Sequence, residues 1–461
     1  EAASVQLLTD AMNAQYEAYQ EEAITEPLIA KQPVAGTIKS EKYNAEIDAT
    51  EFVLSNGVKV VLKTTDFEPD NISIQMFEEG GKRSFSPAQA ANVLLCGDAY
   101  ECSKIGPFDA KTLRKYFAGK KIQFGFEIAN YTNIFQGSST VKDFPTMMEL
   151  LYASFTAVSE DKASYDAQIN QARAVMSNYS KDPDFIFQQH IDGVKFNNDP
   201  LLMSPTVETL DQANYSEMIG MINEITSNAA DFTLLIVGNI NAETLRPYLT
   251  DYVASLPSTG KKSKVKDVVS LAVVPGIHND TYKQTMQTET VNVYDCYTGT
   301  NLKYNTENSV MVDFIGDILD MNFVETLREE EGGTYGAQTY SIFQPNTKQW
   351  QILYTFKTNH EQQESLRARA HKELMELLNN GANPTHFNKV KEATLKQLDI
   401  KEHSNRYWMS KLLMKERGFD TYTSERAAVE NLTLEKLNSF MKKLYNGKNR
   451  IEVVMLGSPN N

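Results

Sequence analysis

The sequence has few cysteines, no long hydrophobic run and no excess of basic charge. Its three cysteines, Cys96, Cys102 and Cys296, cannot all pair with one another, so they form no disulfide framework in a chain of 461 residues. No stretch approaches the ~18 apolar residues of a membrane-spanning helix. Lys and Arg number 45 against 60 Asp and Glu, and the net charge of −15 repels nucleic acid and anionic membranes. We therefore expect no membrane span and no nucleic-acid partner.

Histidine is also scarce. A hydrolytic zinc ion usually has three protein ligands, and two of them are commonly histidines on one helix. No two histidines here lie within five residues of each other, so neither H-E-x-x-H nor H-x-x-E-H occurs. We expect no metal site in this chain, and a site assembled from distant positions is the less favoured alternative. Solvated helix or loop positions are expected for all six histidines: His190, His278, His360, His371, His386 and His403.

Other catalytic motifs are absent or incomplete. Cys96 and Cys102 are six positions apart without neighbouring histidines, which favours buried, inert thiols over a zinc knuckle. No Gly-x-Ser-x-Gly elbow occurs. Residues 332–336 (GGTYG) lack the Lys-Ser/Thr ending of a phosphate loop, and the acidic residues 329–331 just before them would repel phosphate. The sequence therefore offers no serine-hydrolase or nucleotide site.

Local patterns predict a mixture of strands and helices. Residues 5–22 have the apolar spacing of a helix, and the Pro-containing residues 26–40 are typical of an extended connector. Asn56-Gly57 predicts a hairpin turn between two apolar β segments. Further patterns predict strands at 71–77, 122–138 and 232–238, and helices at 88–102, 109–118 and 141–178.

The second half of the chain repeats this order of elements. Tyr165 and Phe185 match Phe387 and Tyr407, each 222 positions later, and the run ending at Gly238 matches one ending 219 positions later at Gly457. We predict an α+β protein with two homologous domains, each a mostly antiparallel sheet covered by helices. The predicted boundaries are 1–44 for the helix and connector, 45–260 for the first domain and 261–461 for the second. The polar, basic residues 258–266 form the predicted linker.

One motif carries candidate chemistry. Arg328 ends a helical pattern at 310–328, and Tyr335 begins a β pattern at 335–341, within the segment LREEEGGTYG. A guanidinium and a phenol are donors that can polarise a scissile carbonyl and stabilise an oxyanion. The ordinary alternative is a charge at a helix C-terminus and a half-buried strand residue. Spacing alone favours the ordinary alternative.

The segment around Arg328 and Tyr335 resembles the Arg/Tyr element in the C-terminal half of pitrilysin-family (insulinase-family) zinc metallopeptidases. These inverzincins share the fold of the mitochondrial processing peptidases. Residues 50–63 (TEFVLSNGVKVVLK) resemble the opening hairpin of each half, and residues 5–40 the linker between the halves. Residues 106–113 (GPFDAKTL) are similar to the bacterial two-half members. The resemblance implies metallopeptidase-like α/β sandwich domains, and that Arg328 and Tyr335 hold the substrate carbonyl across an enclosed chamber.

The sequence departs from the family at its zinc helix. In the catalytic half this helix carries H-x-x-E-H, whereas residues 88–102 here contain no histidine. Asp98 and Glu101 lie in this stretch, but two carboxylates without imidazole make a poor zinc site, and surface or capping roles are expected. The resemblance therefore implies the inactive half, with zinc bound by the other half. Because the chain begins at Glu1, we expect the active half upstream in the same polypeptide.

The resulting hypothesis is a non-catalytic, substrate-binding half of a zinc metalloendopeptidase that degrades or processes peptides in a closed chamber. Its expected partners are a peptide substrate and the N-terminal catalytic half, in the same polypeptide or as a separate chain. The expected compartment is the bacterial periplasm, and the chain alone is expected to be inactive. The alternative is a non-enzymatic scaffold or partner subunit of the same fold, which needs a separate zinc-bearing chain.

Overall fold

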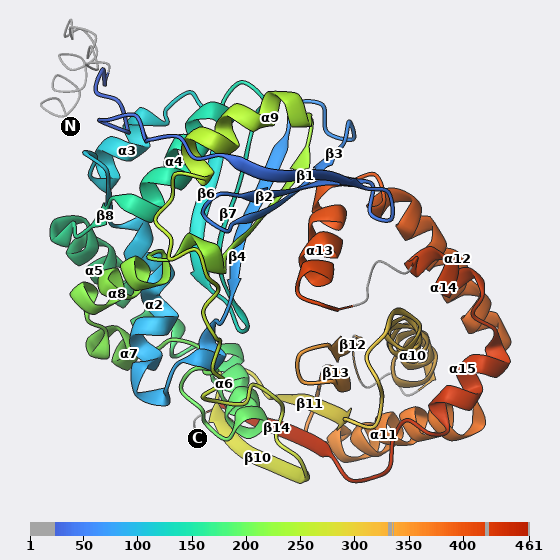
Figure 1. Ribbon diagram of the computed structural model, residues 1–461. Helices are drawn as coiled ribbons and strands as arrows, with labels where there is room; N and C mark the ends of the chain where they lie inside the picture. Colours follow the sequence, from blue (N-terminus) through green and yellow to red (C-terminus); the bar gives the residue numbers. More distant parts are fainter. Residues whose placement is uncertain (1–23, 331–333, 335, 420–423, 460–461) are drawn as a thin grey trace, which may run out of the picture.

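The computed structural model describes residues 24–330, 334, 336–419 and 424–459. The helix predicted at 5–22 lies outside these residues. Two β-sheets dominate the structure, and helices cover both of them (Figure 1). No helix in the described part is long and apolar enough to cross a membrane.

The first sheet has seven strands. All neighbouring strands are antiparallel except β3 and β9, which are parallel. The predicted hairpin at Asn56-Gly57 joins β2 to β3, and Gly57 takes the φ of 94° that favours glycine. The strands in their spatial order are β1 (Ile38–Asn44), β2 (Ala49–Leu54), β3 (Lys59–Thr64), β9 (Thr233–Gly238), β4 (Ile72–Glu79), β7 (Thr132–Ser139) and β6 (Ile122–Ile128).

The helices of the first half follow the apolar periodicity of the sequence. Together with the first sheet they form what we call the first unit. A short two-stranded sheet of β5 (Lys104–Ile105) and β8 (Val158–Ser159) lies among them. The helices are α2 (Ala90–Glu101), α3 (Ala110–Tyr116), α4 (Phe144–Thr156), α5 (Lys162–Tyr179), α6 (Pro183–Phe196), α7 (Val207–Gln212), α8 (Tyr215–Ile225) and α9 (Ala242–Tyr248), with 3-10 turns η1 (Lys82–Ser84), η2 (Pro87–Gln89) and η3 (Ala229–Asp231) and a π-helical segment η4 (Leu249–Val253).

The second sheet has five strands and defines the second unit. Its order is β10 (Ile277–Thr285), β14 (Arg450–Ser458), β11 (Thr290–Gly299), β13 (Gln349–Thr358) and β12 (Ala337–Gln344). The last strand in the chain again lies between the first two and runs parallel to the first, as β9 does beside β3. The helices are α10 (Thr306–Phe323), η5 (Val324–Glu330), α11 (Gln363–Asn380), α12 (Pro384–Lys401), α13 (Asn405–Glu416), α14 (Glu425–Glu430) and α15 (Leu434–Met441). The predicted fold class is confirmed.

The repeat is correct in topology but one residue out of register in its last strand. Leu235 of β9 packs in the cluster that contains α13, on the face away from the first unit's own helices. A shift of 219 positions assigns it to Val454, which faces the helices of the second unit instead. The counterparts that face away are Ile451, Val453 and Met455. Side chains along a strand alternate between the two faces of the sheet, so an error of one residue places every side chain on the wrong face. The number of positions between structurally equivalent residues of β9 and β14 is therefore even, not 219.

Each unit lends one helix to the other unit's sheet. Helix α6 packs on the second sheet, where Phe187 and Ile191 join a buried cluster with strand residues such as Val453. Helix α13 packs on the first sheet through Met409 and Leu412 (Figure 1). The two helices hold corresponding places in the repeat, since Phe185 and Tyr407 were matched in sequence. Both units therefore complete their cores with residues from beyond the boundary predicted at 260/261.

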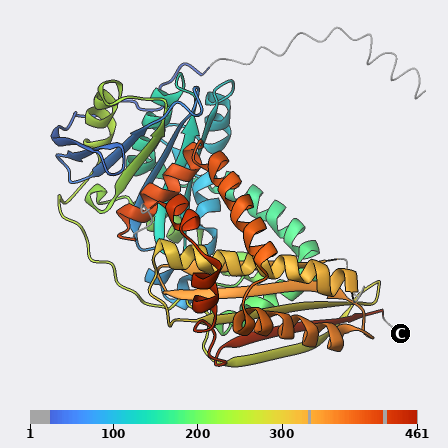
Figure 2. The same ribbon diagram turned by 90° about the vertical axis from the view of Figure 1, so that its right-hand side faces the viewer.

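Two connecting segments are more ordered than their composition predicts. Residues 38–44 were assigned to the connector, but they form β1 and pair antiparallel with β2, so that part of the prediction is wrong. Residues 258–266 are bound along the first unit: the Thr259 N–H donates to Asn228 Oδ1 at 2.8 Å, and Ser263 Oγ donates to Asp231 Oδ2 at 2.8 Å. Figure 2 shows the extended segment that runs from the first unit down to the second. The polar residues of segment 258–266 therefore form hydrogen bonds with the first unit, and the segment is not a free linker.

Candidate functional site

Helix α2 lies in the stretch 88–102, where the resemblance implies the zinc helix of the catalytic half. Asn92 is buried and joins α2 to α8: its amide donates to Glu217 Oε2 at 2.7 Å and its oxygen accepts from the Asn214 N–H at 2.7 Å. Cys96 is fully buried, and this burial raises the pKa of its thiol to about 12, which disfavours the thiolate that binds metals. The inner face of α2 therefore serves helix packing.

The remaining candidate ligands on α2 do not fit a zinc ion. Asp98 and Glu101 are exposed, in keeping with the expected surface role. Cys102 is buried, as expected for an inert thiol, and burial raises its pKa to about 11. Across the described part of the chain, no group of three or more His, Cys, Asp or Glu side chains could hold a metal ion. The residues of this helix therefore do not supply a zinc site.

The Arg/Tyr motif follows helix α10. The helix changes at Val324 into a π-helical segment, η5, that runs to Glu330 and includes Arg328. Such π segments frequently occur at functional sites. The side chain of Arg328 and the whole of Tyr335 lie outside the described residues. Their convergence on one substrate atom therefore stays a prediction.

A groove of about 830 Å³ lies between α10, α12 and strand β12. Strand β12 is the last strand of the second sheet, so within the described part of the chain one of its edges pairs with no other strand. Gly316 allows β12 to lie close to α10, because a Cβ there would meet Ser341 Oγ at 2.5 Å. The Thr339 N–H donates to Asp320 Oδ1 at 3.3 Å across the same contact. A strand edge beside a groove is the geometry by which extended peptides add to a sheet, and on this edge the Thr339 N–H is already bonded to Asp320.

One histidine contradicts the expectation of solvated positions. His386 near the start of α12 is only 3% exposed. Its Nδ1 lies 2.9 Å from Asn322 Oδ1 and its Nε2 lies 3.0 Å from Glu325 Oε1, so it joins α12 to α10 and η5. No sequence pattern indicates this burial, because a lone histidine at the start of a helix looks the same whether buried or exposed.

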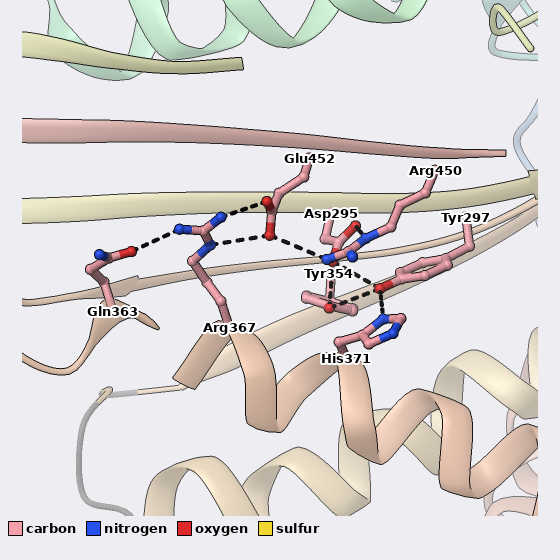
Figure 3. A network of polar contacts seen from close by, with 8 residues as sticks. All are labelled: Asp295, Tyr297, Tyr354, Gln363, Arg367, His371, Arg450 and Glu452. Carbon is pink, nitrogen blue, oxygen red and sulfur yellow. Dashed lines mark hydrogen bonds and ion pairs between the residues drawn. The ribbon is translucent and has the colours of Figure 1, made fainter. Parts of the chain in front are cut away.

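A second polar centre lies between the second sheet and α11 (Figure 3). Asp295 is 1% exposed and accepts hydrogen bonds from Arg450 Nη2 at 2.7 Å and from the Tyr354 hydroxyl at 2.6 Å. Burial raises the pKa of Asp295, although Arg450 opposes the rise. The network contains two carboxylates and two guanidinium groups, so its charges balance. Its members are Asp295, Tyr297, Tyr354, Gln363, Arg367, His371, Arg450 and Glu452. We interpret it as a structural network that joins the sheet to α11.

Comparison with known proteins agrees with this architecture. Residues 217–394 match the family model of the peptidase M16 inactive domain. The probable zinc protease PqqL of Escherichia coli is 20% identical over 416 residues, which cover 88% of this chain and 44% of that protein. The zinc protease PQQL-like of Arabidopsis thaliana is 21% identical over 422 residues, 87% of this chain and 41% of that protein. The chain thus spans less than half the length of these relatives.

Solved structures give the same result for the fold. The periplasmic protease PqqL from E. coli superposes with a TM-score of 0.83 at 18% identity, over 99% of this chain and 50% of that chain. A peptidase M16 inactive domain from Pseudomonas fluorescens superposes with a TM-score of 0.69 at 15% identity, over 90% of this chain and 99% of that chain. Pitrilysin superposes with a TM-score of 0.63 at 14% identity, over 93% of this chain and 46% of that chain.

The fold and the two-unit repeat are those of the M16 peptidases. The family model that residues 217–394 match is that of the inactive domain, and the fold of nearly the whole chain is that of PqqL. The resemblance to the non-catalytic half of a pitrilysin-type peptidase is thereby confirmed.

Proposed function

We propose that this chain is the substrate-binding, non-catalytic half of a zinc metalloendopeptidase that degrades or processes peptides. The observation that carries the proposal is the superposition of nearly the whole chain on half of PqqL, together with a helix α2 that contains no histidine. Zinc would be bound by a second, catalytic half. The two halves would enclose a chamber that opens to admit a peptide and closes to exclude water.

Within this half, Arg328 and Tyr335 are proposed to donate hydrogen bonds to the substrate carbonyl and to the oxyanion that forms from it. Both residues precede β12 in the sequence, and β12 borders the groove beside α10. An extended peptide that pairs with β12 would be held through its backbone, which suits unfolded substrates of varied sequence. The groove and the donors thus belong to one proposed binding surface.

Three further statements are part of the proposal. The domain boundaries are 1–44, 45–260 and 261–461, except that residues 38–44 belong to the first sheet as β1 and that α6 and α13 each cover the other unit's sheet. The compartment is the periplasm, by analogy with the E. coli protein described as periplasmic. The catalytic half belongs to the same polypeptide, which is consistent with the share of PqqL that the chain covers.

The test compares this chain alone with the chain joined to its zinc-bearing half. The joined protein is expected to cleave unfolded peptides in a chelator-sensitive way. Arg328→Ala and Tyr335→Phe are each expected to lower kcat/KM by about tenfold to a thousandfold, the scale of a lost oxyanion donor. Arg406→Ala, an exposed arginine on α13, is the matched control.

Two results would contradict the proposal. Stoichiometric zinc binding with peptide cleavage by this chain alone would make it a catalytic half. Unchanged kinetics in both Arg328→Ala and Tyr335→Phe would remove their assigned role and favour a scaffold subunit of the same fold.

A further inference from the structure

His386 is the only histidine in the described part of the chain with under a tenth of its surface exposed. It is the third residue of α12 and reaches two residues on the neighbouring helical segment. Its Nδ1 lies 2.9 Å from Asn322 Oδ1, in the last turn of α10. Its Nε2 lies 3.0 Å from Glu325 Oε1, in the first turn of η5. The imidazole therefore bridges the point where the α-helix becomes a π-helix.

Both contacts can form in either protonation state of the ring. The imidazolium donates from both nitrogens, to the amide oxygen of Asn322 and to the carboxylate of Glu325. A neutral ring protonated at Nε2 still donates to Glu325, and it accepts from Asn322 when that amide turns its NH₂ group inward. The bridge therefore depends on the presence of the imidazole more than on its charge.

The bridge holds a side of η5 that faces away from the core. Phe323 and Leu327 are fully buried in the hydrophobic cluster of the second unit and fix the inner side of the segment. Glu325 points away from that cluster, and its side chain is 57% exposed. His386 is its partner there. Without this contact, the π-helical turn could rotate about its buried side.

Arg328 follows Glu325 by three residues, within the same π-helical segment. A π-helical turn is rare, and it occurs mostly as a single turn within an α-helix. Two attachments of the described part of the segment help to set the direction in which residue 328 leaves it: apolar burial on one side and the His386 bridge on the other.

We propose that His386 is a positioning residue: through Asn322 and Glu325 it fixes the π-helical segment that carries Arg328. This inference rests on the proposed role of Arg328 as a donor to the substrate carbonyl. His386 itself touches no substrate in this proposal. It acts only by holding the donor's backbone in the productive direction, where small displacements have large kinetic consequences.

The experiment uses the joined protein with its zinc-bearing half and an unfolded peptide substrate. His386→Ala is expected to lower kcat by about tenfold to a hundredfold with little change in KM, since the donor acts mainly in the transition state. His386→Gln keeps one donor and is expected to lose less. His278→Ala is the control, a histidine on β10 at the opposite edge of the second sheet, bonded to the Pro275 carbonyl at 2.9 Å. It is expected to leave kcat unchanged.

A second variant avoids the cavity that His386→Ala creates. Glu325→Ala removes a largely exposed carboxylate, so the fold is expected to persist, and it breaks the same bridge from the other side. Glu325→Gln retains an acceptor oxygen and is expected to remain close to the wild type. Agreement between His386→Ala and Glu325→Ala would assign the effect to the bridge rather than to lost packing.

The decisive measurement is a double-mutant cycle with Arg328→Ala. If His386 acts only through Arg328, then His386→Ala and Glu325→Ala have no further effect on kcat in the Arg328→Ala background. If the bridge variants lower kcat by the same factor in the Arg328→Ala background as in the wild type, the inference is overturned, because His386 would then have a general structural role. Unchanged kcat in both bridge variants, with a loss in Arg328→Ala, also overturns it while the proposed function stands. No loss in Arg328→Ala itself would instead contradict the proposed function.

Discussion

The two units bury the helix-covered faces of their sheets in different ways. In the first unit the face is apolar and aromatic. Phe135 is fully buried, and its ring centroid lies 4.7 Å from that of Phe126 and 5.1 Å from that of Phe155. In the second unit, Asp295 and its partner Arg450 occupy part of the same face. Apolar packing tolerates small losses of volume, whereas a buried ionic network is stable only when complete. The same topology is thus supported by two kinds of interaction.

The exchanged helices α13 and α6 also differ in how deeply their polar attachments are buried. Helix α13 is attached to the first unit through Arg417, whose side chain is 7% exposed and lies 2.6 Å from Glu79. The polar attachments of helix α6 to the second unit are more exposed: Asp184 and Lys357 are 65% and 58% exposed and 2.8 Å apart, and His190 and Asp280 are 37% and 30% exposed and 2.8 Å apart. Because exposed ion pairs contribute little, α6 depends more on its apolar face than α13 does.

The largest effect is expected from breaking the network of the second unit. Arg450→Met leaves the buried Asp295 carboxylate without its cation, so the free energy of unfolding should fall by about 3–5 kcal/mol. Denaturant titration at neutral pH measures this loss. The double variant Asp295→Leu with Arg450→Met removes both charges and should lose less than the single variant. A larger loss in the double variant would show that the network stabilises through packing rather than charge balance.

The exchanged helices should make the two units unfold together. Leu412→Ala on α13, a fully buried position, is expected to lower the free energy of unfolding by about 2–5 kcal/mol. The counterpart on α6 is Ile191→Ala. Each change should shift one cooperative transition, followed by calorimetry, because each unit lacks part of its core without the other. Two separate transitions in either variant would mean that the units are stable independently.

The two ion pairs sharpen the comparison of the exchanged helices. Arg417→Ala leaves the half-buried Glu79 and the Asn346 amide oxygen, 2.8 Å from Arg417, without this donor. The expected loss is about 1–3 kcal/mol. Lys357→Ala on the exposed pair should lose less than about 1 kcal/mol. Equal losses in thermal or chemical unfolding would contradict the difference in burial.

An effect confined to part of the pH range is expected from Glu78. Burial raises the pKa of Glu78 at the end of β4 to about 7, while the Asn133 amide, 2.7 Å away, opposes the rise. The folded protein therefore binds this proton more tightly than the unfolded chain, so its contribution to stability is present below about pH 4.5 and is lost as pH rises toward 7.

Glu78→Gln keeps an acceptor for Asn133 and removes this titration. The variant should gain on the order of 1–2 kcal/mol over the wild type at pH 8, and almost nothing at pH 4.5. Urea titrations at the two pH values test this. A difference between the proteins that is independent of pH would show that the Glu78 carboxyl is not the titrating group.

Features that depend on neighbours in sequence were predictable. The turn at Asn56-Gly57, the helix at 88–102 and the strand at 71–77 appear as β2–β3, α2 and β4. Each follows from a local periodicity or from a residue that permits a particular φ. The repeated order of elements was predictable for the same reason, since it only requires each element to be recognised.

Features that depend on contacts distant in sequence were missed. His386 and Asp295 are ordinary polar residues in their local patterns, and only their partners on other elements make them buried. The one-residue error in register arose because the matched glycines, Gly238 and Gly457, carry no side chain that identifies a face. Segment 38–44 lacked apolar alternation, because most of β1 is exposed and its stability comes from backbone pairing with β2.

The sequence by itself determined that the chain is a twofold repeat of strands and helices and that its α2 helix cannot bind zinc as the family does. Both follow from residue types at given positions, and folding cannot change them. Only the tertiary structure decided that α6 and α13 change places between the sheets and that His386 meets the segment carrying Arg328. An apolar helix face specifies burial but not its partner, and that choice is made by the packing of the whole chain.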